Sequence, residues 1–227
     1  GVAAVETSHL RTMRKTMDYI ENNLTEPLCL EEIAANAFGH CSSLTEITLP
    51  NNITYIGISA FENCSSLTEV TIPNSVTDIE WQAFRKCVSL QSIVIPENVL
   101  HFGGDILEDT PWFENLPDGP IYLNQCFYKY KGEMPTDFYI DIKEGTTTIC
   151  DFAFSDCKNL KSISIPQSVT QIGAEAFSGC ESLTSIELPE ELTQIEFGTF
   201  YNCSSLRSIT IPSKVERIEK HAFELCK

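Results

Sequence analysis

A 23-residue block recurs along most of this chain and limits what the chain can fold into. A cysteine marks each copy. It returns at this constant interval in two series, Cys41, Cys64 and Cys87, then Cys157, Cys180, Cys203 and Cys226. A constant period of this length is typical of stacked coils, because one coil cannot bury its apolar side alone. The sequence therefore predicts a repeat solenoid.

Each block contains the pattern of one strand. In the second copy, residues 67–72 alternate between apolar and polar, and Pro73 follows. Alternation predicts a strand with one buried face, and proline ends it because it has no N–H for the ladder. Equivalent strands of stacked coils would pair in a parallel sheet. The Ala60-Phe61 pair and its equivalents predict a short helical turn on the opposite side. We expect about eight coils of this α/β kind.

Residues 1–36 differ from the repeat. Apolar residues Leu10, Met13, Met17, Ile20 and Leu24 follow one another at intervals of three and four, which predicts an amphipathic helix. Residues 28–37 are rich in Glu and Ala and predict a second, shorter helix. We therefore predict an N-terminal helical cap over residues 1–36 and a solenoid over residues 37–227.

A divergent coil interrupts the repeat within residues 103–150. Residues 121–123 and 127–130 predict two strands around a turn at Asn124-Gln125. Aromatic residues gather in this coil, and they either fill a core that lacks the regular layers or project as anchors for a partner. Tyr128 and Tyr130 share one face of their strand, so they are candidate binding residues under the second interpretation.

The ten cysteines do not form a disulfide framework in this interpretation. Equivalent residues of stacked coils lie about 4.8 Å apart with parallel Cβ directions, whereas the Cβ atoms of a disulfide are about 3.8 Å apart. Thr110 also occupies the cysteine position of one coil, where no sulfur is available. We expect buried free thiols, and no zinc-binding spacing is present.

The net charge of −17 and a pI near 4.5 exclude several classes of partner. Nucleic acids and anionic membrane surfaces both require clustered Lys and Arg. No apolar run approaches the roughly 18 residues that span a bilayer. We therefore expect no nucleic-acid partner and no membrane insertion.

Catalysis has little support in the sequence. The four histidines fall at variable repeat positions and form no metal-binding pair, and the serines and cysteines recur at packing positions of every coil. No glycine-rich phosphate loop is present. We expect no enzyme activity, no cofactor and no metal.

Protein binding is better supported, through the outer face of the predicted sheet. The alternation of the strands places a polar row on this face, although a merely solvated sheet would show the same pattern. The candidate binding residues on it are Glu46, Thr48, Glu69, Thr71, Ser92, Val94, Ser164, Glu187 and Thr210.

Residues 37–227 closely resemble the BspA-like leucine-rich repeats, on the pattern Ala-Phe-x-x-Cys-x-Ser-Leu-x-x-Ile-x-Ile-Pro-x-x-Val-x-x-Ile. That family occurs in surface proteins of bacteria and in some protists. The resemblance implies a non-catalytic adhesion module at the cell surface or secreted, with a protein ligand such as a host matrix or surface protein.

Part of the N-terminal segment resembles something else. Residues 17–34, from Met17-Asp18-Tyr19 to Ile33-Ala34, look like the first helices of an AraC-type DNA-binding domain, without its recognition helix. This resemblance implies an alternative function, a cytoplasmic regulatory fragment whose helices and repeats contact other proteins. The sequence leaves the cytoplasmic location open beside the surface location.

The last copy stops at Cys226-Lys227, before the next strand and without a polar capping unit. An uncovered sheet edge tends to pair with a neighbour. We therefore expect either an end-to-end contact between molecules or a longer natural solenoid.

Overall fold

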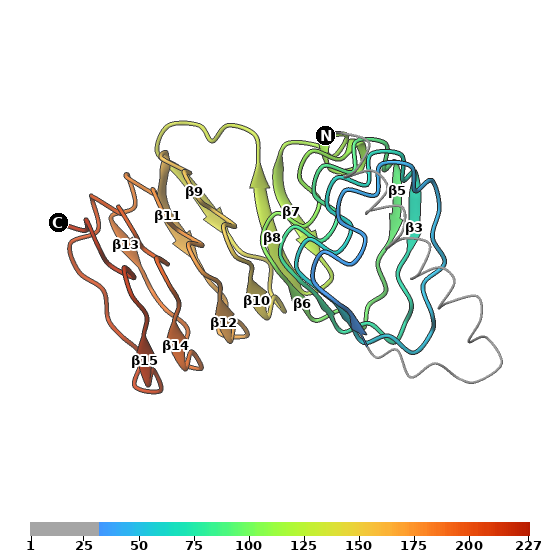
Figure 1. Cartoon of the computed structure of the whole chain (residues 1–227). Helices are drawn as coiled ribbons and strands as arrows, with labels where there is room; N and C mark the ends of the chain where they lie inside the picture. The colour runs from blue at the N-terminus through green and yellow to red at the C-terminus, as the bar shows by residue number, and fades with distance from the viewer. Residues whose placement is uncertain (1–31) are drawn as a thin grey trace. The chain divides into compact units, whose positions relative to one another are not determined.

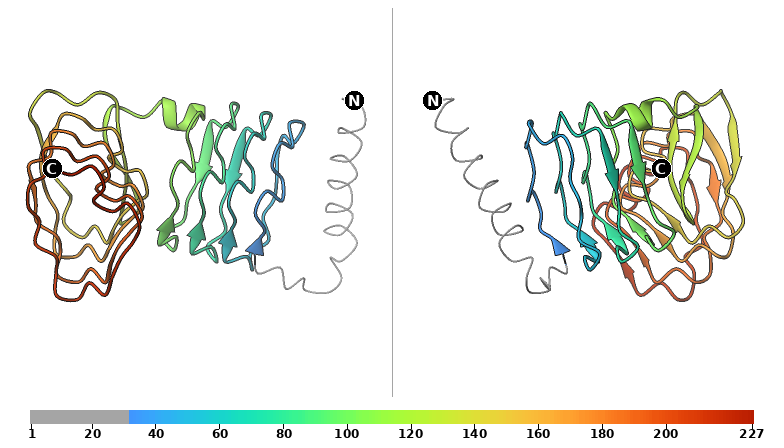
Figure 2. Two further views of the ribbon diagram at one scale, coloured as in Figure 1. Left: turned by 60° about the vertical axis from the view of Figure 1, so that its left-hand side comes forward. Right: turned by 90° about the vertical axis from the view of Figure 1, so that its right-hand side faces the viewer.

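The computed structural model describes residues 32–227, which divide into two compact units. The described part of the first unit comprises residues 32–99 and 106–116, and the second comprises residues 100–105 and 117–227. Figure 1 labels their strands, and Figure 2 shows that the coils of each unit stack side by side. The predicted helix over residues 10–24 lies outside the described residues.

In the first unit, successive coils pair in parallel with a shift of one repeat. Strands β1 (Glu32–Ile33), β2 (Tyr55–Ile56) and β4 (Asp78–Ile79) form one ladder, in which Ile33 faces Ile56 and Ile56 faces Ile79. Strands β3 (Glu69–Thr71) and β5 (Ser92–Val94) form a second ladder with Val70 opposite Ile93. The 23-residue register predicted by the sequence is confirmed.

Strand β1 corrects one prediction. Residues 28–37 were expected to form a short helix, but Glu32–Ile33 is a strand and residues 35–40 are turns. Ile33 lies one repeat before Ile56 and is 5% exposed, so it occupies the regular core position of a coil. Pairing with the next coil outweighs the local helical propensity of the Glu- and Ala-rich stretch. The described solenoid therefore includes residues that we had assigned to a helical cap.

The segments around each Ala-Phe pair are also not helices. They are successive turns, in which the amide of Cys64 donates to the carbonyl of Phe61 and the amide of Phe61 donates to Ala83 in the next coil. Two positions per coil have positive φ, such as Ser59 at 53° and Asn63 at 59°. Left-handed residues interrupt the right-handed run that a helix requires. The predicted short helical turns are thus wrong in form, although their place in the coil is right.

A single four-residue helix is present among residues 32–227, α2 (Pro111–Glu114). Thr110 caps it, because its hydroxyl accepts a hydrogen bond from the amide of Phe113 at 3.2 Å and donates to Leu107. Thr110 thus occupies the cysteine position of this coil, where it caps the helix α2.

The second unit contains the remaining strands. They are β6 (His101–Phe102), β7 (Gly119–Leu123), β8 (Cys126–Lys131), β9 (Phe138–Asp141), β10 (Thr148–Ile149), β11 (Leu160–Ser164), β12 (Gln171–Ile172), β13 (Ser185–Ile186), β14 (Gln194–Ile195) and β15 (Arg217–Ile218). Strands β8, β10 and β12 pair in parallel, as do β9, β11 and β13, and β14 pairs with β15.

The divergent coil is a β-hairpin. Strands β7 and β8 pair antiparallel around Asn124, which has a φ of 53°. The two predicted strands and their turn are confirmed. Tyr128 is 1% exposed, and the ring of Phe127 stacks on that of Phe154 with centroids 4.5 Å apart. The hairpin therefore joins the core of the second unit, and its central aromatic residues fill it.

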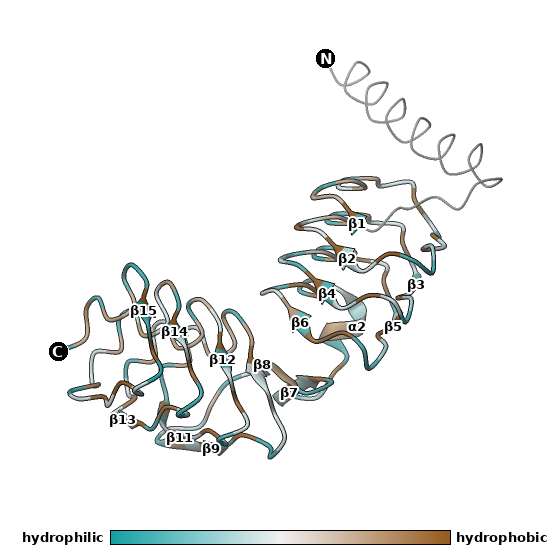
Figure 3. Cartoon of the chain, turned by 90° about the horizontal axis from the view of Figure 1, so that it is seen from below, coloured by the Kyte–Doolittle hydropathy of each residue, from teal (hydrophilic) through white to brown (hydrophobic). Residues whose placement is uncertain are grey.

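The core of each unit is built from columns of identical side chains. The rings of Phe38, Phe61 and Phe84 are parallel with centroids 5.0 and 5.1 Å apart, as are those of Phe154, Phe177 and Phe200 at 5.3 and 5.5 Å. Such separations fit offset stacking. Figure 3 shows the alternation of hydrophobic and hydrophilic residues along each coil. Core packing therefore repeats from coil to coil.

The cysteine column adds hydrogen bonds between successive coils. The thiol of Cys64 donates to the carbonyl oxygen of Phe38 at 3.1 Å, and the thiol of Cys203 donates to Phe177 at the same distance. All nine cysteines of residues 32–227 are free thiols. The bond explains why this position takes cysteine, which is small and apolar but can still satisfy a carbonyl.

Candidate functional site

The outer face of the sheet presents the predicted polar row in both units. In the first unit Glu69 lies opposite Ser92 and Thr71 opposite Val94, and all four are exposed. Glu46 and Thr48 are exposed too, but they lie in an extended segment outside the assigned strands. In the second unit the exposed residues of the row include Ser164, Glu187 and Thr210.

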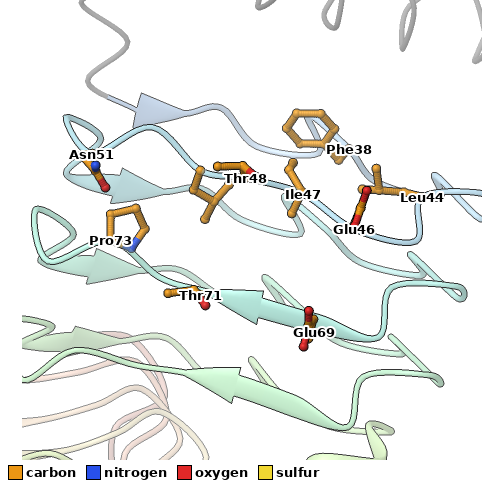
Figure 4. Close-up of a pocket in the computed structure, with 10 residues that line it drawn as sticks. Phe38, Leu44, Glu46, Ile47, Thr48, Asn51, Glu69, Thr71 and Pro73 are labelled. Carbon is orange, nitrogen blue, oxygen red and sulfur yellow. The ribbon is translucent and has the colours of Figure 1, made fainter.

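The first unit is hollowed beside this row. A shallow groove of about 730 Å³ lies between the segment of Glu46 and Thr48 and the strand β3, as Figure 4 shows. Its polar lining residues are Glu46, Thr48, Glu69 and Thr71. Its apolar lining residues are Phe38, Leu44, Ile47 and Leu49, and Asn51 and Pro73 lie at one end. Glu69 and Thr71 belong to the coil next to that of Glu46 and Thr48, so four of the predicted residues line one depression.

Tyr128 is not a surface residue. It is 1% exposed in strand β8, so it offers no side chain to a partner, and its place among the candidate binding residues is corrected. Tyr130 is half-buried, and its ring meets that of Phe138 edge to face at 5.3 Å. The two tyrosines were expected to be both inside or both outside. Strand β8 instead loses burial toward its end, from Tyr128 to Lys131.

Two residues of this outer face were absent from the predicted set of binding residues. Strand β9 places Tyr139 opposite Ser162 and Asp141 opposite Ser164, so both extend the polar row into the divergent coil. Tyr139 is 53% exposed, and its hydroxyl donates a hydrogen bond to the carboxylate of Asp141. This bond raises the pKa of Tyr139, because ionisation would break it and place two negative charges together. The face therefore carries an aromatic side chain.

The signal for Tyr139 was present in the sequence. Ile140 and Ile142 lie one repeat before Ile163 and Ile165, which fixes the phase of the strand. The residues between and beside them must then point outward with Ser162 and Ser164. The aromatic composition of the divergent coil directed attention to Tyr128 and Tyr130 instead.

Several thiols of the cysteine column have raised pKa values, although hydrogen bonding with Cys64 lowers the pKa of Cys87. Burial raises the pKa of Cys41 to about 11, and it raises the pKa of Cys157 and of Cys203 to about 12. A thiol is reactive only as the thiolate. At neutral pH these groups stay protonated, which fits a packing role.

Metal ligation and membrane spanning find no support in residues 32–227. Within that range no group of three or more His, Cys, Asp or Glu residues is arranged to hold a metal ion. No helix in the same range is long and apolar enough to cross a bilayer.

The stacked coils, the parallel ladders and the uniform 23-residue register define a leucine-rich repeat solenoid. A family profile described as the BspA type leucine rich repeat region, in six copies, matches residues 19–117 and 123–227. The chain therefore belongs to the BspA type leucine-rich repeat family. The profile also covers residues 19–34, for which we noted a resemblance to an AraC-type domain. The AraC-type resemblance therefore gains no support, and neither does the cytoplasmic alternative derived from it.

Several solved structures are similar to this chain. A leucine-rich cell surface protein of Faecalibacterium prausnitzii is 26% identical with a TM-score of 0.46, and the match covers 88% of this chain and 62% of that one. The pneumococcal vaccine antigen PcpA is 24% identical with a TM-score of 0.47, covering 87% and 52%. A leucine-rich repeat protein of T. pallidum is 27% identical with a TM-score of 0.35, covering 85% and 69%.

This chain spans less than two thirds of the length of the first two of these proteins. No curated protein matches it.

Proposed function

We propose that this chain is a non-catalytic protein-binding module that holds a protein ligand on the outer face of its sheet. The observation that carries the proposal is the outer row of the second unit, in which the exposed Tyr139 and Asp141 continue the line of the half-buried Ser162 and the exposed Ser164. An exposed aromatic side chain with a polar neighbour is typical of interface anchors. Most other side chains of the row are short and polar, so a ligand can come close to the backbone of the strands.

The size of the face supports a ligand that also contacts the flanking loops. A standard interface uses about 20 to 30 residues on each side. The row of the second unit supplies fewer, namely Tyr139, Asp141, Ser162, Ser164, Ser185, Glu187, Ser208 and Thr210. Asp141 and Glu187 give this row negative charge, and the whole chain has a charge of −17, so partners with basic surfaces would be favoured.

We place this module at the bacterial cell surface or outside the cell, with adhesion to a host matrix or surface protein as its role. The family resemblance of the repeat supports this location and role. The organisation into a helical cap and a solenoid with a divergent coil at about residues 103–150 stays a proposal as well, with the cap ending before the strand Glu32–Ile33.

The test is binding of the purified chain to a panel of extracellular-matrix and host-surface proteins at physiological salt. One variant changes the face of the second unit, Tyr139→Lys, Ser164→Lys and Glu187→Lys. A second variant changes the face of the first unit, Glu69→Lys, Thr71→Lys and Val94→Lys. We expect one of the two to bind at least about tenfold more weakly, equivalent to about 1.4 kcal/mol.

A matched control separates the face from the change in charge. The substitutions Val88→Lys, Leu100→Lys and Glu144→Lys add as much positive charge as the first variant, on exposed residues away from the row. If the control loses as much binding as the face variants, the face is not the binding surface. If no protein of the panel binds, the proposed adhesion role is wrong for these ligands.

A further inference from the structure

A second recess lies among the turns of the last coils, away from the sheet of β9, β11 and β13. It has a volume of about 270 Å³ and is lined by Glu175, Phe197, Gly198, Tyr201, His221 and Glu224. We call these residues the Gly198 recess. All six belong to the second unit.

One coil lacks a side chain at this recess. Positions 152, 175, 198 and 221 are equivalent, and each has a positive φ. Phe, Glu and His occupy positions 152, 175 and 221, whereas position 198 is a glycine with a φ of 60°. A Cβ at Gly198 would lie 2.9 Å from Cγ of Glu175, so the glutamate side chain lies directly over the glycine backbone. Gly198 has no side chain of its own, and the side chain of Glu175 lies in the place where one would be.

At Gly104, another glycine of the second unit, the place of the missing side chain is taken by an aromatic ring instead. At Gly104 a Cβ would lie 2.5 Å from the ring of Phe152, so an aromatic ring from a neighbouring segment occupies the missing volume. Around Gly198 the neighbouring aromatic ring stays open to solvent, since Phe197 is 44% exposed. Exposed aromatic surface beside a recess favours a bound group that would cover it.

The side chains of the recess are suited to positive charge. Glu175 and Glu224 bring two carboxylates, and Glu224 pairs with the ring nitrogen Nδ1 of His221. The His221 ring meets Phe197 edge to face, with centroids 5.2 Å apart at 79°. The face of Phe197 and the half-buried Tyr201 supply negative ring faces. Lys220 is exposed and does not line the recess.

We propose that the Gly198 recess binds an organic cation, that is, an ammonium or guanidinium group with an aliphatic body. Carboxylates attract the charge and aromatic faces attract both the charge and the methylene groups next to it. Such a group comes either from a Lys or Arg side chain of a protein or from a small free cation. The recess is made by turns rather than by the polar row, so this proposal does not depend on the proposed function.

The experiment is a titration of the isotope-labelled full chain at neutral pH, followed by the amide signals of Gly198, Tyr201 and Glu224. The probes are tetramethylammonium chloride, N-acetyl-arginine amide and N-acetyl-lysine amide, with sodium chloride at equal ionic strength as the reference. We expect saturable shifts confined to the recess. Saturation by tetramethylammonium would identify a free cation as sufficient, and saturation by the amino-acid amides alone would identify a protein side chain.

Two variants and a control complete the test. Glu175→Gln removes one carboxylate, and Gly198→Asn displaces the side chain of Glu175 with a residue that tolerates positive φ. Each is expected to weaken binding at least about tenfold. Gly145→Asn is the control, because Gly145 has a φ of 84° and open space around it. Shifts no larger than those with sodium chloride, or equal affinity in the variants and the control, would overturn the proposal.

Discussion

The thiol of Cys180 donates a hydrogen bond to the carbonyl oxygen of Phe154, 3.2 Å away and 26 residues earlier in the chain. The bond ties one coil to the coil before it at the centre of the core, where both residues are fully buried. The same pairing recurs along the column, so the contribution of one bond can be measured by substitution.

Cys180→Ala is expected to lower the free energy of unfolding by about 1–3 kcal/mol, because it leaves a small cavity and an unpaired buried carbonyl. Urea unfolding followed by circular dichroism measures it. Cys226→Ala is the matched control, since Cys226 makes the same bond to Phe200 but is only half-buried. Equal losses in the two variants would show that burial of the bond has no effect.

The stability of the protein should fall at alkaline pH. Burial raises the pKa of Cys203 to about 12, whereas an unfolded thiol ionises near 9. Below pH 9 both states hold the proton, and above it only the unfolded state loses the proton. The stabilisation is therefore lost as the pH rises from about 9 to 12, by up to about 1.4 kcal/mol per pH unit for each such thiol.

Urea midpoints at pH 8, 9.5 and 11 measure this loss. The Cys203→Ala variant should show a shallower dependence than the parent, because one thiol no longer contributes. A midpoint that stays constant up to pH 11 would contradict the raised pKa of the buried thiols.

Lys86→Gly should stabilise the protein by about 0.5–1 kcal/mol. Lys86 has a φ of 59°, a conformation that costs a non-glycine residue about 1–2 kcal/mol. Glycine removes that cost but gives the unfolded chain more entropy, worth about 0.4–1 kcal/mol, so the gain is partial. Thermal unfolding measures it. Val88→Gly, at an exposed position without positive φ, should destabilise, and a matching loss at Lys86 would refute the argument.

Ile33→Ala tests the strand that replaced a predicted helix. Ile33 is 5% exposed and pairs with Ile56, so its truncation should cost about 2–4 kcal/mol in unfolding free energy. Ile58→Ala, at a side chain that is 45% exposed, should change stability by about 0.5 kcal/mol or less. If the two substitutions cost the same, Ile33 is not a core residue of the first coil.

Much of the fold follows from periodicity alone. The 23-residue interval determined which residues stack, and the two-residue alternation within each strand predicted the exposed faces of β3, β5 and β11. The hairpin of β7 and β8 was also predictable, because short apolar runs flank a turn sequence. These signals repeat or are local, so they need no knowledge of distant contacts.

The failures arise where local and long-range preferences disagree. Residues 32–37 have a helical composition, but Glu32–Ile33 pairs with the equivalent strand of the next coil. The turns around Ala-Phe look helical in sequence, yet Ser59 and Lys86 adopt positive φ. Their amides donate to carbonyls of the next coil, those of Trp81 and Glu108. Tyr139 was missed, although it lies one repeat before Ser162 and must therefore be on the outer face. Burial of Tyr128 depends on the pairing of β8 with β10, which composition does not reveal.

The one-repeat shift between paired strands has a mechanical consequence. Each coil bonds only to its two neighbours, as β14 does to β15 and β10 does to β12. A pulling force applied along the stack would therefore detach coils one after another from a free end rather than rupture the whole unit at once. Each event would release one 23-residue repeat, or about 75 Å of extended chain, and the force trace would be a sawtooth of even teeth.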